Sequence, residues 1–435
     1  MIIKGLSEDK IKQISEAKHE DKKTLEFRLK CYKKFEELGL PKFGPSIHLD
    51  FDKIVYYKSS LDNLTDDWGK INLDTKKELD SLGVLESEEH MDGIGVQYQS
   101  EVIYHNMLKE LEEKNVIFTS IENAFKNHRD LIDKYFSKIV KPEENKFTAL
   151  NGAVFSGGSF IYIPKNTKLD RPLQSYFRIN SKDLGQFERT LIIVDDNSSL
   201  HYVEGCTANN YSSSNLHAAV VEIYVGKNST CRYSTIQNWA TNVYNLVTKR
   251  ALVEENGTME WIDGNIGSHK TMKYPCCVLK GDNSKGTCIT ISVAKKGQHQ
   301  DSGAKMIHIG KNTVSDIISK SIASSGGKSD FRSLVDIKKS AVNSESMVKC
   351  DTLILDKESS SDTYPTNRVG NKSSTIEHEA TVSKISEDKL FYLMSRGIPK
   401  ERAIEMIILG FTDEFKKELP MEYAVELNSL LKQNL

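Results

Sequence analysis

The sequence predicts a mainly β protein whose core is built from stacked coils. Between Leu191 and Asp356 the chain consists of short apolar, β-branched runs, with no helical pattern of ten residues between them. Such residues favour pleated, half-buried surfaces. Asparagine-centred turns separate many of the runs at intervals of 27 to 31 residues, at Asn197, Asn228, Asn256, Asn283 and Asn312. A fixed period in this range is typical of repeat architectures, so we expect a β-solenoid or a rolled β-sandwich.

The segment before this core, residues 1–145, is predicted to be mostly helical. Ser7 has the character of an N-cap, and a second helix is expected from about residue 24 to 38. A strand is expected at 51–57, and two further helices at 102–113 and 120–136. Near Pro142 the composition changes toward glycine and β-forming residues, which places the β core at 146–382.

The last segment, residues 383–435, is predicted to be helical again. Four short helices are expected to begin near Ser386, Pro399, Thr412 and Pro420, with Gly397 and Gly410 ending the first two. A tail this short cannot bury all its apolar side chains alone. It either packs on the β core or presents a groove to a partner.

Charge and composition exclude several classes of function. The 59 basic and 61 acidic residues give a net charge of −2, so no basic field indicates nucleic acid as a partner. No apolar run of about 18 residues is present for a membrane span, and the first residues lack the apolar core of a signal peptide. Seven scattered cysteines, an odd number, favour a reducing compartment.

Motifs of common enzyme classes are missing. There is no Cys-x-x-Cys pair and no Gly-x-Ser-x-Gly elbow. The segment 326–329 resembles the end of a phosphate-binding loop, but position 322 is isoleucine where that motif needs glycine. We therefore expect an ordinary loop there and no ATP hydrolysis by this chain.

Two cysteines have contexts that suit chemistry. Cys206 follows Glu204 and Gly205 at a strand end, where we expect an accessible thiol. Cys350 begins an apolar strand and follows Lys349, whose charge would favour a thiolate. On local sequence alone, packing in the core remains the alternative for both.

Two further groups of residues could hold or guide a ligand. Glu377, His378 and Glu379 are dense in potential metal ligands, but in a regular strand His378 would face away from the two glutamates. Gln237 and Trp239 would share one strand face, where they either line a cavity or pack in the core.

Long strings of residues carry a resemblance to a known family. They lie at 104–106, 153–160, 173–180, 185–191, 202–208, 237–239, 247–251, 305–310 and 377–380. Together they cover nearly the whole chain and resemble the SufB branch of the SufB/SufD family of iron–sulfur cluster assembly proteins. The SufD branch looks different at 204–206 and 237–239.

The resemblance implies a right-handed parallel β-helix flanked by N-terminal and C-terminal helical domains, and a scaffold rather than an enzyme. It implies that Cys206 accepts persulfide sulfur. The residues it places along the sulfur route are Arg178, Asn180, Gln237, Trp239 and Lys249. The residues it places at the nascent cluster site are Cys350, Glu379, His378 and Glu377, with Cys350 and Glu379 as the metal ligands.

The resemblance also implies partners and a location. The C-terminal helices would dock the ATPase SufC, and the β-helix would pair with SufD or with a second SufB chain. A cysteine desulfurase and its sulfur carrier would supply sulfur, a transient [4Fe–4S] cluster would be assembled, and the complex could hold reduced flavin. The location would be the bacterial cytoplasm or a plastid or apicoplast stroma.

Two other classes of function stay open on the residues alone. A β-solenoid hydrolase or lyase acting on polysaccharide could use Glu377 and Glu379 as paired carboxylates. A purely structural partner subunit like SufD would carry no cluster.

Overall fold

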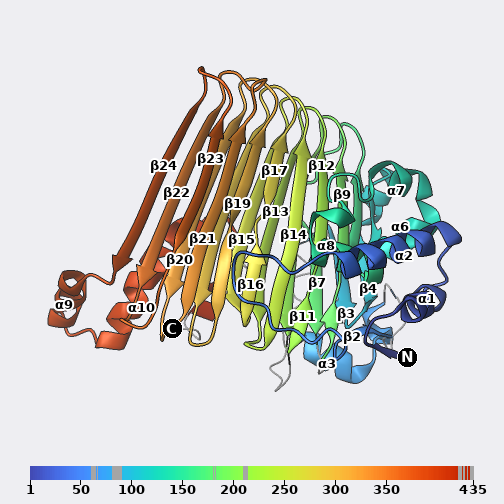
Figure 1. Cartoon of the computed structure of the whole chain (residues 1–435), viewed down its shortest axis with the longest axis horizontal. Helices are drawn as coiled ribbons and strands as arrows, with labels where there is room; N and C mark the ends of the chain where they lie inside the picture. The colour runs from blue at the N-terminus through green and yellow to red at the C-terminus, as the bar shows by residue number, and fades with distance from the viewer. Residues whose placement is uncertain are drawn as a thin grey trace.

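The computed structural model describes residues 1–59, 65, 67–80, 91–179, 181, 183–208, 214–419, 424, 427–428 and 430–431. It confirms the mainly β fold, a β-solenoid of about seven turns with helices at both ends (Figure 1). The N-terminal helices gather at the end of the solenoid where β3 to β9 lie, and the C-terminal helices begin at the β24 end.

Two sheets form the walls of the solenoid. The first has ten strands in spatial order β24-β22-β20-β18-β15-β13-β10-β7-β3-β4. Their bounds are β24 Thr375–Lys384, β22 Glu345–Ile354, β20 Val314–Ala323, β18 Lys285–Ala294, β15 Thr258–Gly267, β13 Thr230–Trp239, β10 Ser199–Ala208, β7 Leu173–Ile179, β3 Gly93–Tyr98 and β4 Glu101–Met107. All neighbours are parallel except β3 and β4.

The second sheet has twelve strands, and its main path runs β23-β21-β19-β16-β14-β12-β9-β6-β5. The bounds are β23 Thr363–Val369, β21 Lys328–Ile337, β19 His299–His308, β16 Lys270–Lys273, β14 Val243–Val253, β12 Val220–Val225, β9 Arg189–Val194, β6 Ser159–Ile163 and β5 Ile117–Ser120, with β8 Gly185–Gln186, β11 Asn215–His217 and β17 Cys276–Leu279 beside this path. Along the core, the chain alternates between the two sheets, so every coil adds a layer to both walls.

The turn asparagines form a ladder along one edge of the solenoid. Asn228, Asn256 and Asn283 each have φ between 55° and 60°, the left-handed region that asparagine tolerates. Each side-chain amide donates to the carboxamide oxygen of the preceding turn asparagine, at 3.0 to 3.1 Å. The asparagine period in the sequence is therefore the period of the coils, as predicted.

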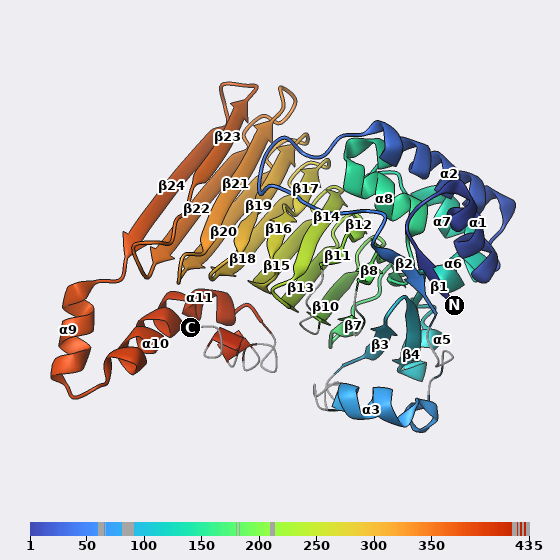
Figure 2. The same cartoon turned by 60° about the horizontal axis from the view of Figure 1, so that its bottom comes forward.

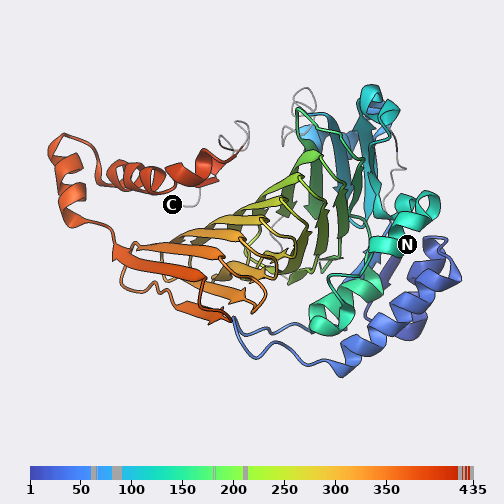
Figure 3. The same ribbon diagram turned by 90° about the horizontal axis from the view of Figure 1, so that it is seen from above.

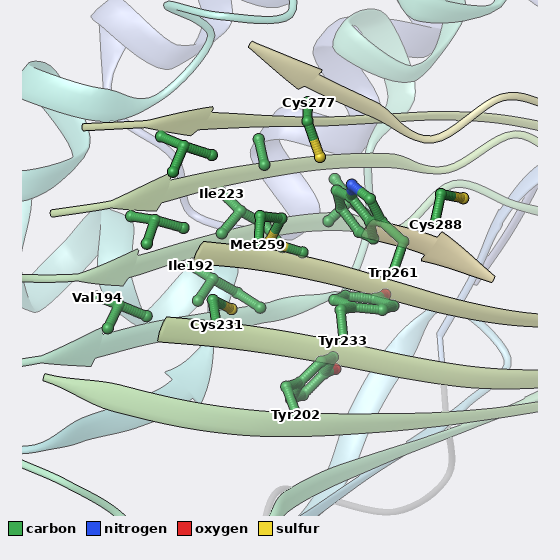
Figure 4. Packing of buried hydrophobic residues seen from close by; sticks show 14 of the residues in the cluster. Ile192, Val194, Tyr202, Ile223, Cys231, Tyr233, Met259, Trp261, Cys277 and Cys288 are labelled. Carbon is green, nitrogen blue, oxygen red and sulfur yellow. The ribbon is translucent and has the colours of Figure 1, made fainter. Parts of the chain in front are cut away.

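The interior at this edge is apolar and aromatic. Tyr202, Tyr233 and Trp261 occupy one register position on β10, β13 and β15, and their ring centroids lie 5.0 and 5.2 Å apart. Figure 4 shows this stack beside Cys231, Cys277 and other buried side chains. Every cysteine is free and buried.

The N-terminal segment packs against the first coils of the solenoid. It contains β1 Ile2–Lys4, α1 Glu8–Ala17, α2 Lys22–Glu37, β2 Val55–Lys58, η1 Trp68–Lys70, α3 Leu73–Asp80, α5 Lys109–Glu113, α6 Ile121–Asn127, α7 Arg129–Tyr135, η2 Pro142–Glu144 and α8 Lys146–Val154. Ser7 and Asp21 cap the first two helices.

The helix predicted over 102–113 is wrong for most of its length. Residues through Met107 belong to β4, because Val102, Ile103 and Tyr104 complete a hairpin with β3.

The C-terminal segment contains α9 Glu387–Ser395, α10 Lys400–Phe411 and α11 Asp413–Lys416. Side chains of α10 and α11, among them Ile408 and Phe415, pack on the outer face of the ten-stranded sheet (Figure 2). Thr412 does not cap α11 as predicted, since its hydroxyl donates back to carbonyl oxygens of α10. The helix expected to begin at Pro420 starts outside the described residues.

Two surfaces at the β24 end are left uncovered by the described residues. Helix α9 lies beyond β24 in every view (Figure 3), and none of its residues is buried. The last coil, β23 and β24, is exposed along almost its whole length.

No helix that the structure describes has both the length and the apolar content needed to span a bilayer. The predicted domain limits at 145 and 382 stay predictions; β3, β4 and β5 precede the first limit and still pair with the two sheets.

Candidate functional site

Cys206 lies inside the solenoid rather than at an accessible strand end. It is 1% exposed, on β10, because strand alternation turns positions 202, 204 and 206 toward the interior. Its thiol contacts a carboxylate oxygen of Glu204, with 3.5 Å between Sγ and Oε1. Burial raises the pKa of the Cys206 thiol well above its usual value, and the carboxylates of Glu204 and Glu188 raise it further.

Gln237 lies beside Cys206, since the two residues are register partners on β13 and β10. Its carboxamide oxygen accepts hydrogen bonds from Asn245 at 2.8 Å and from Lys273 at 3.0 Å. Trp239, two residues further along the same strand face, places its ring 4.6 Å from that of His217. The predicted shared face of Gln237 and Trp239 is therefore confirmed, and both side chains are buried.

Lys249 is one of two buried lysines that share one carboxylate. Asp263 Oδ1 lies 3.2 Å from Lys249 Nζ and 3.4 Å from Lys273 Nζ, and none of the three side chains is exposed to solvent. Burial opposes ionisation of Asp263, but the two ammonium groups hold its pKa below the usual value. Burial lowers the pKa of Lys273 to about 8. The cluster places two cations opposite one carboxylate inside the protein.

His217 joins this interior from the facing sheet. Its ring nitrogens contact Asn245 at 2.8 Å and Glu188 at 2.9 Å. Burial lowers the pKa of His217, but the Glu188 carboxylate more than offsets it, so the pKa is raised overall. Since Asn245 also donates to Gln237, a continuous chain of hydrogen bonds crosses from one wall to the other.

A row of polar side chains leads from Glu204 to Cys350. We call it the Glu204 row: successive register partners on the ten-stranded sheet are Glu204, Thr235, Asp263, Thr290, Ser319 and Cys350. Parallel partners point to the same face, so these six side chains line one strip of the interior. Five strand-to-strand steps separate β10 from β22, which is about 24 Å at the usual strand spacing.

A second strip, the Cys206 row, lies beside the first. Its successive register partners are Cys206, Gln237, Asn265, Ser292, Ser321 and Thr352. The facing sheet contributes polar partners of its own in the order Gln186, His217, Asn245, Thr271, Gln300 and Ser329. Ser292 and Ser302 bridge the two walls at 2.7 Å. The interior between Cys206 and Cys350 is therefore polar on both walls.

Several buried polar atoms in these rows have no hydrogen-bond partner among the described residues. They include Gln237 Nε2, Asp263 Oδ2, both carboxamide atoms of Asn265 and Thr235 Oγ1. Buried polar groups in native proteins almost always bind protein, water or a ligand. The rows therefore have free hydrogen-bonding capacity that faces the interior.

Cys350 lies at the other end of the Glu204 row, on the last strand but one of its sheet. It is 1% exposed, and its Sγ lies 3.7 Å from Thr363 Oγ1 on the facing wall. Burial raises the pKa of its thiol, and the Thr363 hydroxyl opposes this. The expected help from Lys349 is wrong, because the neighbouring position on a strand faces the opposite side.

The structure separates the three predicted ligands near Cys350 onto two faces of β24. Glu377 and Glu379 are exposed, and their register partners are Met347 and Lys349. His378 shares the face of Cys350, which pairs with Ala380, and its buried Nε2 has no partner among the described residues. Within one chain, Cys350 and His378 are therefore brought together, whereas Glu379 lies on the other face.

Arg178, another predicted route residue, does not line this interior. Arg178 donates to Thr207 Oγ1 at 2.9 Å. These two residues are register partners one position beyond Phe177 and Cys206, so they face the opposite side of the sheet. Asn180 lies outside the described residues.

Sequence reasoning assigned no role to six interior residues: Glu188, Glu204, His217, Asn245, Asp263 and Lys273. Each is a polar residue within or beside a run of β-branched residues, and this interruption of the run is the only sign in the sequence that these residues have a role. Without the register, that signal does not tell which polar residues meet across the solenoid.

One other group of ligand atoms lies outside the interior. His299, Asp301 and Asp330 place potential metal-binding atoms within 4.8 Å of one another. Arg332 pairs with Asp301 at 3.0 Å, and His299 and Lys328 both contact Asp330. Because these cationic side chains already balance the negative charge of the two carboxylates, we do not assign a metal site to this group.

Fold and site together define a β-solenoid protein with a polar interior that joins two buried thiols. Comparison with protein families identifies the family. Residues 177–411 match the SufBD core domain of the SUF system for FeS cluster assembly, and residues 90–175 match the SufBD protein N-terminal region. The chain therefore belongs to the SufBD family of iron–sulfur cluster assembly proteins.

Curated relatives agree. Proteins described as iron–sulfur cluster assembly SufBD family proteins, from Staphylococcus saprophyticus, Staphylococcus epidermidis and Staphylococcus aureus, are each 55% identical over 431 residues. The alignment covers 99% of this chain and 93% of each relative. Their names do not distinguish SufB from SufD, so the SufB branch stays a prediction.

Proposed function

We propose that this chain is a SufB-type scaffold that accepts sulfur at Cys206, conducts it through the solenoid and supports cluster assembly at Cys350. The observation that carries the proposal is the continuity of the Glu204 and Cys206 rows, which join the two thiols with polar side chains at every coil. A structural subunit has no need of such a costly buried polar strip.

The interior charges suit sulfur in its anionic form. A persulfide on Cys206 ionises more readily than a thiol, and a buried anion requires a nearby cation. Lys249 and Lys273 provide two cations, and both lower the pKa of Cys206 through their charges. Gln237 holds Lys273 in place through its carboxamide oxygen.

The cluster itself is the cargo of the scaffold. Thiolates bind nascent iron–sulfur clusters best, and nitrogen or oxygen ligands bind them more weakly, which suits release. Cys350 with His378 offers one thiol and one imidazole on a shared face. Such a set is incomplete for a four-iron cluster, so a partner chain would supply further ligands, and Glu379 would face that partner.

Two uncovered surfaces support the proposed partners. Helix α9 exposes Phe391 and Tyr392 at 73% and 56%, an apolar pair that suits docking of the ATPase SufC. The edge of the last coil, β23 and β24, would pair with SufD or with a second copy, since uncovered strand edges are prone to association. ATP hydrolysis would come from SufC.

The polysaccharide-cleaving alternative has little support in the geometry. Glu377 and Glu379 lie two positions apart on one exposed strand, whereas paired carboxylates of such enzymes flank a bound sugar. The bacterial relatives favour the bacterial cytoplasm over a plastid as the place of action.

Anaerobic reconstitution with iron and sulfide tests the proposal. The proteins compared are the wild type, Cys350→Ser and the control Cys288→Ser, which removes a buried interior thiol from the apolar core. Iron, acid-labile sulfide and visible absorbance are measured together, on the chain alone and on the complex co-expressed with SufC and SufD.

Cluster on the wild type and on the control, with loss in Cys350→Ser, is the expected result. A full cluster on Cys350→Ser would place assembly elsewhere. A wild type without cluster in both preparations would favour the structural-subunit alternative.

A further inference from the structure

Glu204 is a buried carboxylate whose two oxygens have separate partners. One oxygen, Oε1, accepts a hydrogen bond from the thiol of Cys206, with 3.5 Å between Oε1 and Sγ. The other, Oε2, accepts the hydroxyl of Tyr233 from the next coil. Since Glu204 and Cys206 lie two positions apart on the straight strand β10, the carboxylate is fixed beside the sulfur.

A buried thiol is a poor acceptor of sulfur until it loses its proton. The thiolate is the nucleophile, and burial disfavours that charged form of Cys206. Water cannot remove the proton freely, because Cys206 is almost completely covered. A base within contact distance must therefore take it.

We propose that Glu204 is the catalytic base of sulfur loading: it takes the thiol proton of Cys206 as Sγ attacks the donor persulfide. This inference rests on the proposed function, because it requires that Cys206 is the acceptor. Glu204 belongs to neither the predicted sulfur route nor the predicted cluster site.

The step balances without any added oxidant. The overall exchange is Cys206–SH + R–S–SH → Cys206–S–SH + R–SH. A bond forms between Cys206 Sγ and the outer sulfur of the donor, and the donor S–S bond breaks. Its electron pair stays on the donor sulfur. The proton passes from Sγ to Glu204 and then to the leaving thiolate.

The other titratable groups around Glu204 fit the same assignment. On its own strand they are Tyr202 and Cys206, on β13 Tyr233, on β11 His217 and on β16 Lys273, and each interacts electrostatically with its carboxylate. The register partner on β7 is Ser175, which does not titrate. Burial raises the pKa of both tyrosines, so neither competes as a base.

His217 and Lys273 are unsuited to the role for different reasons. Both nitrogens of His217 are engaged, by Asn245 and Glu188. Lys273 is hydrogen-bonded to Gln237 and paired with Asp263. In the described structure, Glu204 is thus the base that contacts Sγ directly.

Single-turnover sulfur transfer tests the proposal. The purified complex with SufC and SufD is mixed with the sulfur carrier, pre-loaded with ³⁵S persulfide, and label on Cys206 is followed in time from pH 6.5 to 9. The variants are Glu204→Gln, Glu204→Asp and the control Glu260→Gln. Glu260 is a partly buried carboxylate of β15 that pairs with Arg232 and lies outside the site.

We expect Glu204→Gln to slow loading on the order of 100-fold at neutral pH, the usual size of a general-base contribution. Its rate would then rise about tenfold per pH unit, because loading would depend on the fraction of Cys206 that is ionised without the base, and this fraction rises tenfold per pH unit below the thiol pKa. The wild type, Glu260→Gln and Glu204→Asp would keep a shallow pH profile. A merely structural role for Glu204 would lower the rate without steepening its pH dependence.

Three outcomes would overturn the assignment or its premise. Glu204→Gln with the pH profile of the wild type would exclude Glu204 as the base. If that variant misfolds, slow loading by Glu204→Asp with the shallow pH profile of the wild type would exclude Glu204 as the base too. A wild type that gains no label on Cys206 would contradict the proposed function itself, which separates that failure from failure of this inference.

Discussion

Gln237 and Cys206 occupy the same register position on adjacent strands, and Gln237 also accepts a hydrogen bond from Lys273 on the facing sheet. The Gln237 carboxamide therefore links the strand position beside Cys206 to the charged cluster on the facing sheet. This arrangement explains why a glutamine, with both a donor and an acceptor, stands in a strand interior. Its Nε2 has no hydrogen-bond partner among the described residues, so under the proposed function it could donate to a sulfur anion.

Replacing the acceptor thiol is expected to stop sulfur loading. Cys206→Ser removes the nucleophile but keeps a side chain of similar size. Mass-labelled persulfide from the desulfurase and its carrier should then be missing from this chain. Cys231→Ser, at another fully buried position of the interior, serves as the control and should load normally. Normal labelling of Cys206→Ser would refute the acceptor assignment.

Lys273 is expected to make stability depend on pH in the alkaline range. Burial lowers its folded-state pKa to about 8, from 10.5. Between these values the unfolded chain binds more protons than the folded one, so the contribution of Lys273 to unfolding free energy becomes more favourable as pH rises. Relative to Lys273→Met, the wild type should gain up to about 3 kcal/mol from pH 8 to 10.5.

Urea unfolding of both proteins across that pH range measures the difference. Tyrosines and cysteines with raised pKa values also titrate at alkaline pH. They are present in both proteins, so their contributions to the unfolding free energy cancel in the difference. A pH-independent difference would show that the ammonium group keeps an ordinary pKa in the folded protein.

The asparagine ladder is expected to contribute to stability through both conformation and hydrogen bonds. Asn256 has φ of 55° and bonds to Asn228 and Asn283. Asn256→Ala should lower the unfolding free energy by about 1–2 kcal/mol, the cost of the left-handed conformation. Asn256→Gly removes the ladder bonds but accepts that conformation, so its loss should be smaller. Equal losses would assign the whole effect to hydrogen bonds.

Helix α9 is expected to bind a partner without supporting the fold. Deleting residues 386–435 would also uncover the sheet face beneath α10 and α11, so a point change is the sharper test. Phe391→Asp should weaken SufC binding at least about tenfold, since buried aromatic anchors dominate interfaces, and leave the melting temperature unchanged. Leu73→Asp, at an exposed apolar residue of the other end, is the control. If Phe391→Asp still binds SufC as the wild type does, SufC docks on a surface other than α9.

Local signals were sufficient to predict the coils but not their interior. The Asn197 to Asn312 period follows from turn chemistry, which needs only neighbouring residues. The burial of Cys206 and the pairing of Lys273 with Asp263 depend on the register between strands far apart in the chain. The misassigned helix at 102–113 has the same cause, because β3 turns Val102 to Met107 into a strand. Exposure of Cys206 was predicted from its strand end, whereas the solenoid covers it.

The stacked coils also determine how far apart the two thiols lie. Each coil between Cys206 and Cys350 adds one strand to the ten-stranded sheet, and so about 4.8 Å to their separation. Insertion or loss of a whole coil would preserve the turn ladder and both rows while changing the separation of the two thiols by one fixed increment. Insertion of a few residues would instead shift side chains to the wrong face. Length variation among homologous solenoids is therefore constrained to whole coils within this span, and freer in the terminal segments.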